Sequence, residues 1–228
     1  MDFIRTITES TPLLLEGIKL TVLISLLSLL IGMLIGFFAC IMGMSKNPVL
    51  KGISSVYVWI IRGTPMLVQA FIVYFGMPQV VQKLFDPSFR IDAFTAGVIT
   101  LSLNAGAYLS EIFRGGISAV SKGQTEAARS LGLSKSRTMI KVVLPQAVKV
   151  AIPSMVNQFI ITVKDTSILS VIGLADVVNK AKVYVGKSYQ FFATYILVAV
   201  YYLVVISILM VVSNYLEKKI NYEHKGRS

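Results

Sequence analysis

Long runs of apolar residues, separated by short polar stretches, dominate the pattern of the chain. A helix that crosses about 30 Å of hydrocarbon at 1.5 Å per residue needs about 20 mainly apolar residues. Five segments approach or exceed this length, so the pattern predicts five membrane spans in a single domain, residues 1–228. The predicted spans are residues 13–44, 56–81, 93–114, 150–165 and 190–215, and a loop of residues 115–149 separates the third from the fourth.

The composition agrees with this pattern and narrows the class of protein. The 228 residues have a mean hydropathy of +0.73, with 55% hydrophobic and 14% charged residues, whereas a soluble domain carries about 25% charged residues. Most of the surface is therefore expected to face membrane lipid, and the length suits one helical bundle without a separate catalytic domain. The single cysteine, Cys40, lies in an apolar run, so no disulfide framework or metal cluster is expected. The sequence predicts an all-α integral membrane protein with no enzyme site.

The distribution of basic residues predicts the orientation of the chain. Lysine and arginine accumulate in cytoplasmic loops, so a net charge of +11 does not by itself indicate nucleic-acid binding. With the N-terminus outside, the inner segments carry 13 basic residues and the outer segments 6, which predicts N-out, C-in. The inner residues are Lys46, Lys51, Arg114, Lys122, Arg129, Lys135, Arg137, Lys141, Lys149, Lys218, Lys219, Lys225 and Arg227, and the outer ones are Arg5, Lys83, Arg90, Lys180, Lys182 and Lys187.

The loop between the third and fourth spans has the pattern of two short helices. The first is expected over residues 123–131 and ends at Gly132, because glycine commonly caps a helix C-terminus. Ser134 can cap a second helix over residues 135–144. Pro145 is expected to end this helix or to kink it into the next span.

Two interpretations of this loop compete with a transport role. A helix, a glycine-containing turn and a second helix also describe a DNA-binding helix-turn-helix, and residues 128–134 resemble one locally. A unit held between two membrane spans would have to approach DNA at the bilayer surface, so no nucleic-acid partner is expected. The other alternative is a solvated amphipathic linker.

The spacing of the loop residues resembles the EAA signature of permease subunits of bacterial ABC importers. After Glu-Ala-Ala come three residues and a glycine, then nine residues, Val142 where isoleucine is usual, one residue, and Leu-Pro. The matching residues are Glu126, Ala127, Ala128, Gly132, Leu144 and Pro145.

Polar residues in the spans extend the resemblance to the polar amino-acid branch of this family, in order over residues 12–217. It implies a five-span type I importer permease fold in a bacterial inner or cytoplasmic membrane. It also implies a second permease subunit, identical or different, two cytoplasmic ATPase subunits that bind ATP and Mg, and an extracytoplasmic amino-acid-binding protein. No cofactor is expected on this chain. The residues that carry this part of the resemblance are 61–65, 104–108, Glu111, 157–159 and 164–167.

The resemblance gives the loop a physical role as the part that receives motion from the ATPase. A short cytoplasmic helix ended by a glycine can seat in a groove of another protein, while the carboxylate of Glu126 meets a basic group there. For a single glutamate the ordinary alternative is a solvated surface residue, but the full spacing favours coupling. The predicted coupling residues are Gly123, Glu126, Ala127, Ala128, Gly132, Leu144 and Pro145.

Charged residues inside predicted spans are expected to be paired, because a charge at bilayer depth costs about 2.5–3.5 kcal/mol on insertion scales. Near the cytoplasmic ends of the second and third spans, Arg62 can pair with Glu111, or Glu111 can pair with Arg114 one turn on. Gly63 and Pro65 loosen the helix beside Arg62. We expect these residues to be structural.

Uncharged polar residues in the second and third spans have two interpretations. Thr64 and Gln69 can satisfy backbone groups that the glycine and the proline set free, or they can line a substrate pathway. Asn104 in the third span is a further pathway candidate.

The fourth span is expected to break. Asp165 or Ser167 can cap a helix that restarts over residues 168–172, and broken helices in membranes line cavities where their N-terminal amides suit a carboxylate. In the alternative, Lys164 and Asp165 only pair with each other. The predicted substrate pathway is Thr64, Gln69, Asn104, Asn157, Gln158, Lys164, Asp165, Thr166 and Ser167.

The adjacent amides of Asn157 and Gln158 also bear on the cargo. An amide can donate to and accept from another amide but neutralises no charge, so a neutral polar amino acid, with glutamine favoured, is expected over arginine or cystine. The resemblance of this region to glutamine permeases points the same way. The alternative function is a self-sufficient channel or secondary carrier, although carriers usually contain internal repeats that this sequence does not show.

Overall fold

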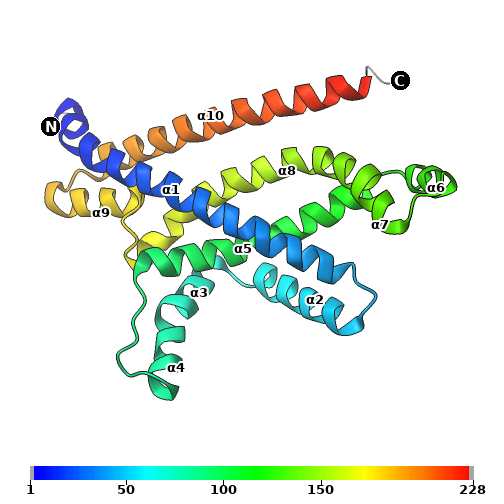
Figure 1. Ribbon diagram of the computed structural model, residues 1–228. Coiled ribbons are helices and arrows are strands. Elements are labelled where there is room, and N and C mark those ends of the chain that lie inside the picture. The colour runs from blue at the N-terminus through cyan, green and yellow to red at the C-terminus, as the bar shows by residue number, and fades with distance from the viewer. Residues whose placement is uncertain (1–2, 226–228) are drawn as a thin grey trace.

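The computed structural model describes residues 3–225, with side chains described as far as residue 218, and every regular element in this part of the chain is helical. Figure 1 shows an elongated molecule, with the N-terminus and α9 at one end and α6 at the other. The elements are α1 (Phe3–Gly43), α2 (Pro48–Gly63), α3 (Met66–Phe71), η1 (Ile72–Gly76), α4 (Met77–Leu84), α5 (Ala93–Ser118), α6 (Lys122–Ser130), α7 (Lys135–Thr138), η2 (Met139–Val143), α8 (Leu144–Asp165), η3 (Thr166–Ile172), α9 (Val177–Ser188) and α10 (Phe191–Lys225).

The interface of α1 with α5 is the most extensive helix pairing in the described chain. Small residues let the two backbones approach closely, as is typical of packing within membranes. A Cβ atom at Gly36 would lie 2.8 Å from the carbonyl oxygen of Gly106, and one at Gly106 would lie 2.8 Å from Ile35. These two helices therefore form the central pair against which other helices pack.

Within the described residues, three helices are long and apolar enough to cross a membrane, at 3–43, 135–172 and 191–218. A fourth candidate is the pair formed by α2 and the segment 66–84, whose axes differ by 106°. Helix α5 packs at the centre but is not among these candidates. The count of five spans stays a prediction, because length and composition alone support three or four.

The expected end or kink at Pro145 takes the form of a π-helical turn. Residues 135–172 form one continuous helical rod in which η2 precedes Pro145, so the helix that contains the fourth predicted span extends well beyond residues 150–165. A proline ring removes one backbone donor and collides with the carbonyl four residues earlier, and a widened π turn accommodates both effects. The same arrangement occurs at η1, which precedes Pro78 by the same spacing.

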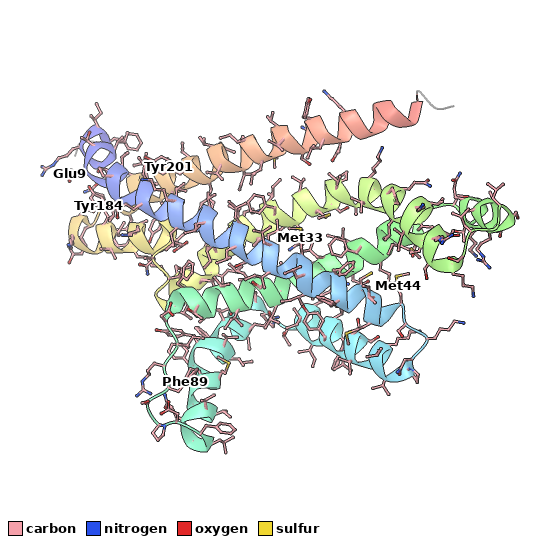
Figure 2. All side chains as sticks on the ribbon, in the orientation of Figure 1. Glu9, Met33, Met44, Phe89, Tyr184 and Tyr201 are labelled. Carbon is pink, nitrogen blue, oxygen red and sulfur yellow. The ribbon has the colours of Figure 1, made fainter. Side chains whose placement is uncertain are left out.

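At the opposite end, α9 packs against α1 and α10 through Leu14, Val177, Ala181 and Leu197. A Cβ atom at Gly17 of α1 would lie only 2.5 Å from the Cα of Val177, so α9 begins in direct contact with α1. This end of the molecule carries Glu9 and Tyr184, which lie close together in Figure 2 and are joined by a hydrogen bond of 3.1 Å. The two ends of the bundle are therefore built from different elements.

Candidate functional site

The polar residues of the second predicted span form a hydrogen-bond network at the break where α2 ends and α3 begins. Helix α2 ends at Gly63, Thr64 is extended with φ −120° and ψ 146°, and Pro65 precedes the next helix. The Gln69 amide nitrogen donates to the carbonyl oxygens of Ile61 (2.7 Å) and Thr64 (3.0 Å), and it lies 2.9 Å from the Thr64 hydroxyl. The expectation that Thr64 and Gln69 satisfy freed backbone groups is confirmed.

Asn104 of α5 also belongs to this hydrogen-bond network. Its side-chain amide donates to the Gln69 oxygen at 3.2 Å, and both residues are buried, with 8% of each exposed. The structure thus brings together three predicted pathway residues from two spans. Their side chains form hydrogen bonds with one another and with the backbone. This network therefore stabilises the break between α2 and α3 and is not an exposed polar surface.

The intramembrane charges are paired in both of the ways that the sequence suggests. A guanidinium nitrogen of Arg62 lies 3.7 Å from a carboxylate oxygen of Glu111, and Arg114 forms an ion pair and hydrogen bonds with the same carboxylate. The Arg62 guanidinium also stacks 5.2 Å from the centre of the Tyr108 ring. The structural interpretation of Arg62 and Glu111 is therefore supported by geometry.

Asn157 and Gln158 line a different kind of feature, a polar groove of about 650 Å³ between α5, α8 and α10. Among the described residues, no hydrogen bond engages either side-chain amide, although Gln158 is only 3% exposed. Residues of α10, which are not among the predicted pathway residues, complete the groove. The signal was available, since these are polar residues close to the end of an apolar run: Ser213, Asn214 and Glu217.

The helix break predicted at residues 164–167 is wrong, whereas the place of these residues in a substrate pathway stays a prediction. Helix α8 tightens into the 3-10 helix η3 at Thr166 without a side-chain cap, so neither Asp165 nor Ser167 starts a new helix. The hydroxyls of Thr166 and Ser167 instead donate to carbonyls three residues back, at 2.8 Å and 2.7 Å. Lys164 and Asp165 form no ion pair within 4 Å in the described chain, and all four residues lie outside the polar groove. The chain therefore remains helical from α8 into η3.

The loop between the third and fourth predicted spans has the predicted local geometry at the end of its first helix and the start of its second. Helix α6 spans Lys122–Ser130, and Gly132 follows it with φ +83°, a left-handed conformation that favours glycine. The amide of Leu133 donates to the carbonyl of Ala128 at 3.1 Å, which closes the helix end. Ser134 caps α7 by accepting from the backbone of Arg137 at 3.3 Å, as expected.

The surface of α6 differs at one position from the expected contact face. Gly123, Glu126 and Ala127 are exposed, but Ala128 is only 6% exposed and faces the rest of the loop. Leu131, at the end of the helix, is 82% exposed, and it adds an apolar residue to the outer face. Leu144 and Pro145 lie behind α6, at the start of α8.

Comparisons with known proteins agree with this arrangement. The family described as "Binding-protein-dependent transport system inner membrane component" matches residues 28–222. The chain is 39% identical over 211 residues to the probable amino-acid ABC transporter permease protein YckA of Bacillus subtilis (strain 168), which covers 92% of this chain and 90% of the relative. It is 35% identical over 207 residues to the putative glutamine transport system permease protein GlnP of Rickettsia typhi (strain ATCC VR-144 / Wilmington), covering 91% and 92%. It is 39% identical over 197 residues to the arginine transport system permease protein ArtQ of Bacillus subtilis (strain 168), covering 86% and 87%.

Solved structures show the same fold. A chain described as "Crystal structure of an amino acid ABC transporter with histidines" superposes with a TM-score of 0.89 at 38% identity, over 96% of this chain and 99% of that one. A methionine ABC transporter chain in an inward-facing conformation superposes with a TM-score of 0.75 at 16% identity, over 91% and 96%, which supports the fold alone. The chain belongs to the family of binding-protein-dependent transport system inner membrane components, and it is an amino-acid ABC transporter permease subunit.

Proposed function

We propose that this permease subunit translocates a neutral polar amino acid, with glutamine favoured, and that an extracytoplasmic binding protein delivers this cargo. The observation that carries the proposal is the pair of adjacent amides, Asn157 and Gln158, which open into the polar groove without a hydrogen-bond partner among the described residues. An amide group both donates and accepts, so it can bind the side-chain amide of glutamine without a charge. A cationic side chain would need a second carboxylate besides Glu217, the one carboxylate among the residues that line the groove.

The groove also offers complementary groups for the rest of an amino acid. Glu217 of α10 lies on its wall and can receive the ammonium group, while Ser154 and Ser213 can donate to the carboxylate. Asp165, the acidic residue of the predicted pathway, does not line the groove. Relatives named for glutamine and for arginine are similarly close to this chain, so the proposed preference rests on the chemistry of the groove.

The test of cargo is the ATPase activity of the reconstituted complex, with its cognate binding protein and one amino acid at a time. Glutamine is expected to stimulate hydrolysis more than arginine or cystine. Strong stimulation by arginine together with none by glutamine would overturn the assignment. Transport by the purified chain alone, without an ATPase, would favour the secondary-carrier alternative.

ATP hydrolysis is assigned to separate ATPase subunits, which we propose bind the exposed face of α6. Gly132 gives the sharpest test, because its φ of +83° strains any residue with a Cβ except those, such as asparagine, that tolerate this region. No atom lies within 4 Å of a Cβ built at this position, so the effect of a substitution is conformational rather than steric. Gly132→Ala is expected to reduce transport per ATP hydrolysed more than Gly132→Asn, with normal membrane insertion of both. Equal coupling in the two variants, and in Gly132→Pro, would contradict this role.

The proposed orientation places the N-terminus and α9 outside and α6 inside, at opposite ends of the molecule in Figure 1. A protein without Cys40 and with one introduced cysteine can be labelled by a reagent that does not cross membranes. Ser136→Cys is expected to react only from the inner side, and Lys187→Cys only from the outer side. The reverse labelling pattern would refute the orientation.

A further inference from the structure

A second polar cavity, of about 300 Å³, lies between α1, α2 and α5 and is separate from the groove of Asn157 and Gln158. It is formed where α1 ends and α2 begins, near Met44, which Figure 2 labels at this end of α1. Its polar walls carry Lys51 and Ser55 of α2 and Arg114 of α5, together with the Glu111 carboxylate. Neither the family resemblance nor the amino-acid pathway assigns a role to this cavity.

The charges around the cavity favour an anion. Arg62 and Arg114 both lie against Glu111, so two guanidinium groups share one carboxylate. Lys51 adds a third cation, and within the described residues it forms no ion pair within 4 Å. Among the residues that line the cavity, Lys51 and Arg114 against the Glu111 carboxylate leave an excess of one positive charge, and Arg62, which lies outside the lining, adds a further positive charge beside Glu111. Arginine and lysine with a neighbouring hydroxyl are the groups that proteins use to bind phosphate.

The surroundings of the cavity indicate where such a phosphate would come from. The outer face of α2 beside it is apolar and exposed, with Ile53 and Val56 each 54% exposed and Trp59 75% exposed. Tryptophan is enriched where a membrane protein meets the headgroup region, and basic pockets between spanning helices bind anionic headgroups. An apolar face next to a cationic cavity suits a molecule that carries acyl chains and a phosphate together.

We propose that the cavity between α1, α2 and α5 binds the phosphate of an anionic phospholipid, with the acyl chains along the exposed face of α2. Lys51 and Arg114 hold the phosphate, and Trp59 packs beside the glycerol region. The site depends on the placement of the chain in a membrane and not on the identity of the cargo. Its failure would therefore leave the proposed amino-acid function untouched.

Native mass spectrometry of the purified permease complex, stripped of lipid and titrated with phosphatidylglycerol, tests this site. Lys51→Gln is expected to weaken the tightest lipid-binding event by about fivefold, and Lys51→Glu by more, since a lysine near an anionic lipid surface contributes an affinity of this size. Lys46→Gln is the matched control, because Lys46 is exposed five positions away and does not line the cavity. The control is expected to bind phosphatidylglycerol as the unsubstituted protein does.

Two further titrations separate lipid from other sources of phosphate. Neutral phosphatidylcholine is expected to bind more weakly than phosphatidylglycerol, and inorganic phosphate in the millimolar range is expected to leave the bound phosphatidylglycerol in place. Displacement of the lipid by inorganic phosphate would overturn the lipid assignment. Equal binding of phosphatidylglycerol to the Lys51→Glu and unsubstituted proteins would overturn the site itself.

Discussion

Two pairs of side-chain amides occupy the helices of this permease, and the structure uses them in opposite ways. Gln69 and Asn104 are hydrogen-bonded to each other, and Gln69 also satisfies the carbonyls at the end of α2. Asn157 and Gln158 open into a groove and have no such partners in the described chain. Both pairs looked like candidates for a substrate pathway in the sequence. The two pairs therefore differ in whether the hydrogen-bonding capacity of their amides is used within the protein.

The reason for the difference lies in the backbone beside each pair. The extended Thr64 and the proline that follows it leave carbonyl groups without helical partners, and a nearby amide satisfies them. Around Asn157 and Gln158 the helix is continuous, so its backbone groups are already paired. A buried carboxylate, Asp176, falls between these cases, because one oxygen accepts a hydrogen bond and the other has no partner among the described residues.

Replacing Gln69 by leucine should have the largest effect. The substitution leaves the carbonyls of Ile61 and Thr64 and the amide of Asn104 without a partner, at a cost of about 3 kcal/mol in the free energy of unfolding. Gln158→Leu, at a residue that is equally buried, removes no hydrogen bond within the described chain and should change this free energy by about 0.5 kcal/mol or less. Unfolding of both variants in a denaturing detergent checks the prediction. Equal losses of stability in the two variants would contradict the distinction between the hydrogen-bonded pair, Gln69 and Asn104, and the unbonded pair, Asn157 and Gln158.

Asp176→Asn should have an intermediate effect that depends on pH. Asp176 lies between the fourth and fifth spans, and burial raises its carboxyl pKa to about 6 from 3.8, against the opposing hydrogen bonds from the backbone of Asn179 and Val178. The folded state then holds a proton that the unfolded state releases, so the stability from this group is complete below about pH 4 and is lost as the pH rises through 6. Asparagine keeps the helix cap, so the variant should be more stable than the unsubstituted protein by about 2 kcal/mol at pH 7.5, but not at pH 4.

Asp92 provides a matched control for this measurement. It caps α5 as Asp176 caps α9, but it is exposed, and hydrogen bonds from the side chain and backbone of Thr95 lower its carboxyl pKa below 3.8. Its contribution should be present above pH 3.8 and be lost as the pH falls further, which is the opposite sign. Thermal unfolding of both variants between pH 4 and 7.5 would contradict the burial argument if Asp92→Asn showed the same gain at neutral pH.

Substitution of Gln158 should affect transport more than it affects stability. Gln158→Ala is expected to reduce cargo-dependent uptake into proteoliposomes about tenfold, as expected for the loss of about 1.4 kcal/mol of hydrogen bonding to the moving solute. Gln146→Ala is the control on the same helix, because its amide donates to the carbonyl of Val142 at 2.9 Å and lies outside the groove. Uptake that falls equally in the two variants would indicate a general effect on α8.

The smallest expected change concerns selectivity. Gln158→Glu adds a second carboxylate to the groove, beside Glu217, and should raise the ratio of arginine to glutamine bound by the complex about threefold in the absence of the binding protein, a size typical of a partly solvated charge pair. The preference of the binding protein itself, measured separately, should not change. An unchanged ratio in the complex would contradict a role of Gln158 in the cargo pathway. It would not affect the structural role of Gln69 and Asn104.

Much of the fold follows from local patterns in the sequence. Apolar runs predict the long helices, the glycine after α6 predicts its left-handed end, and Ser134 predicts the start of α7, because these features depend on residues a few positions apart. The charge pair of Arg62 and Glu111 could also be anticipated, since an unpaired charge in a span is costly. The course of the chain at Pro145 could not, because a proline can end a helix, kink it or follow a π turn, and neighbouring helices select among these.

What each polar residue does was decided only by the tertiary structure. Residues 164–167 had the composition of a helix break, yet the helix is continuous there, and the hydroxyl groups of Thr166 and Ser167 donate to the preceding carbonyls. Glu217 lines the same groove as Gln158 although the two are nearly sixty residues apart in the sequence. Asn104 forms a hydrogen bond with Gln69, which belongs to another predicted span. The sequence by itself therefore determined which segments are helical and where polar groups occur along them. Which of those groups remain available to a solute depends on partners brought together by packing, because donors and acceptors that are engaged by other protein groups are not free to bind a solute.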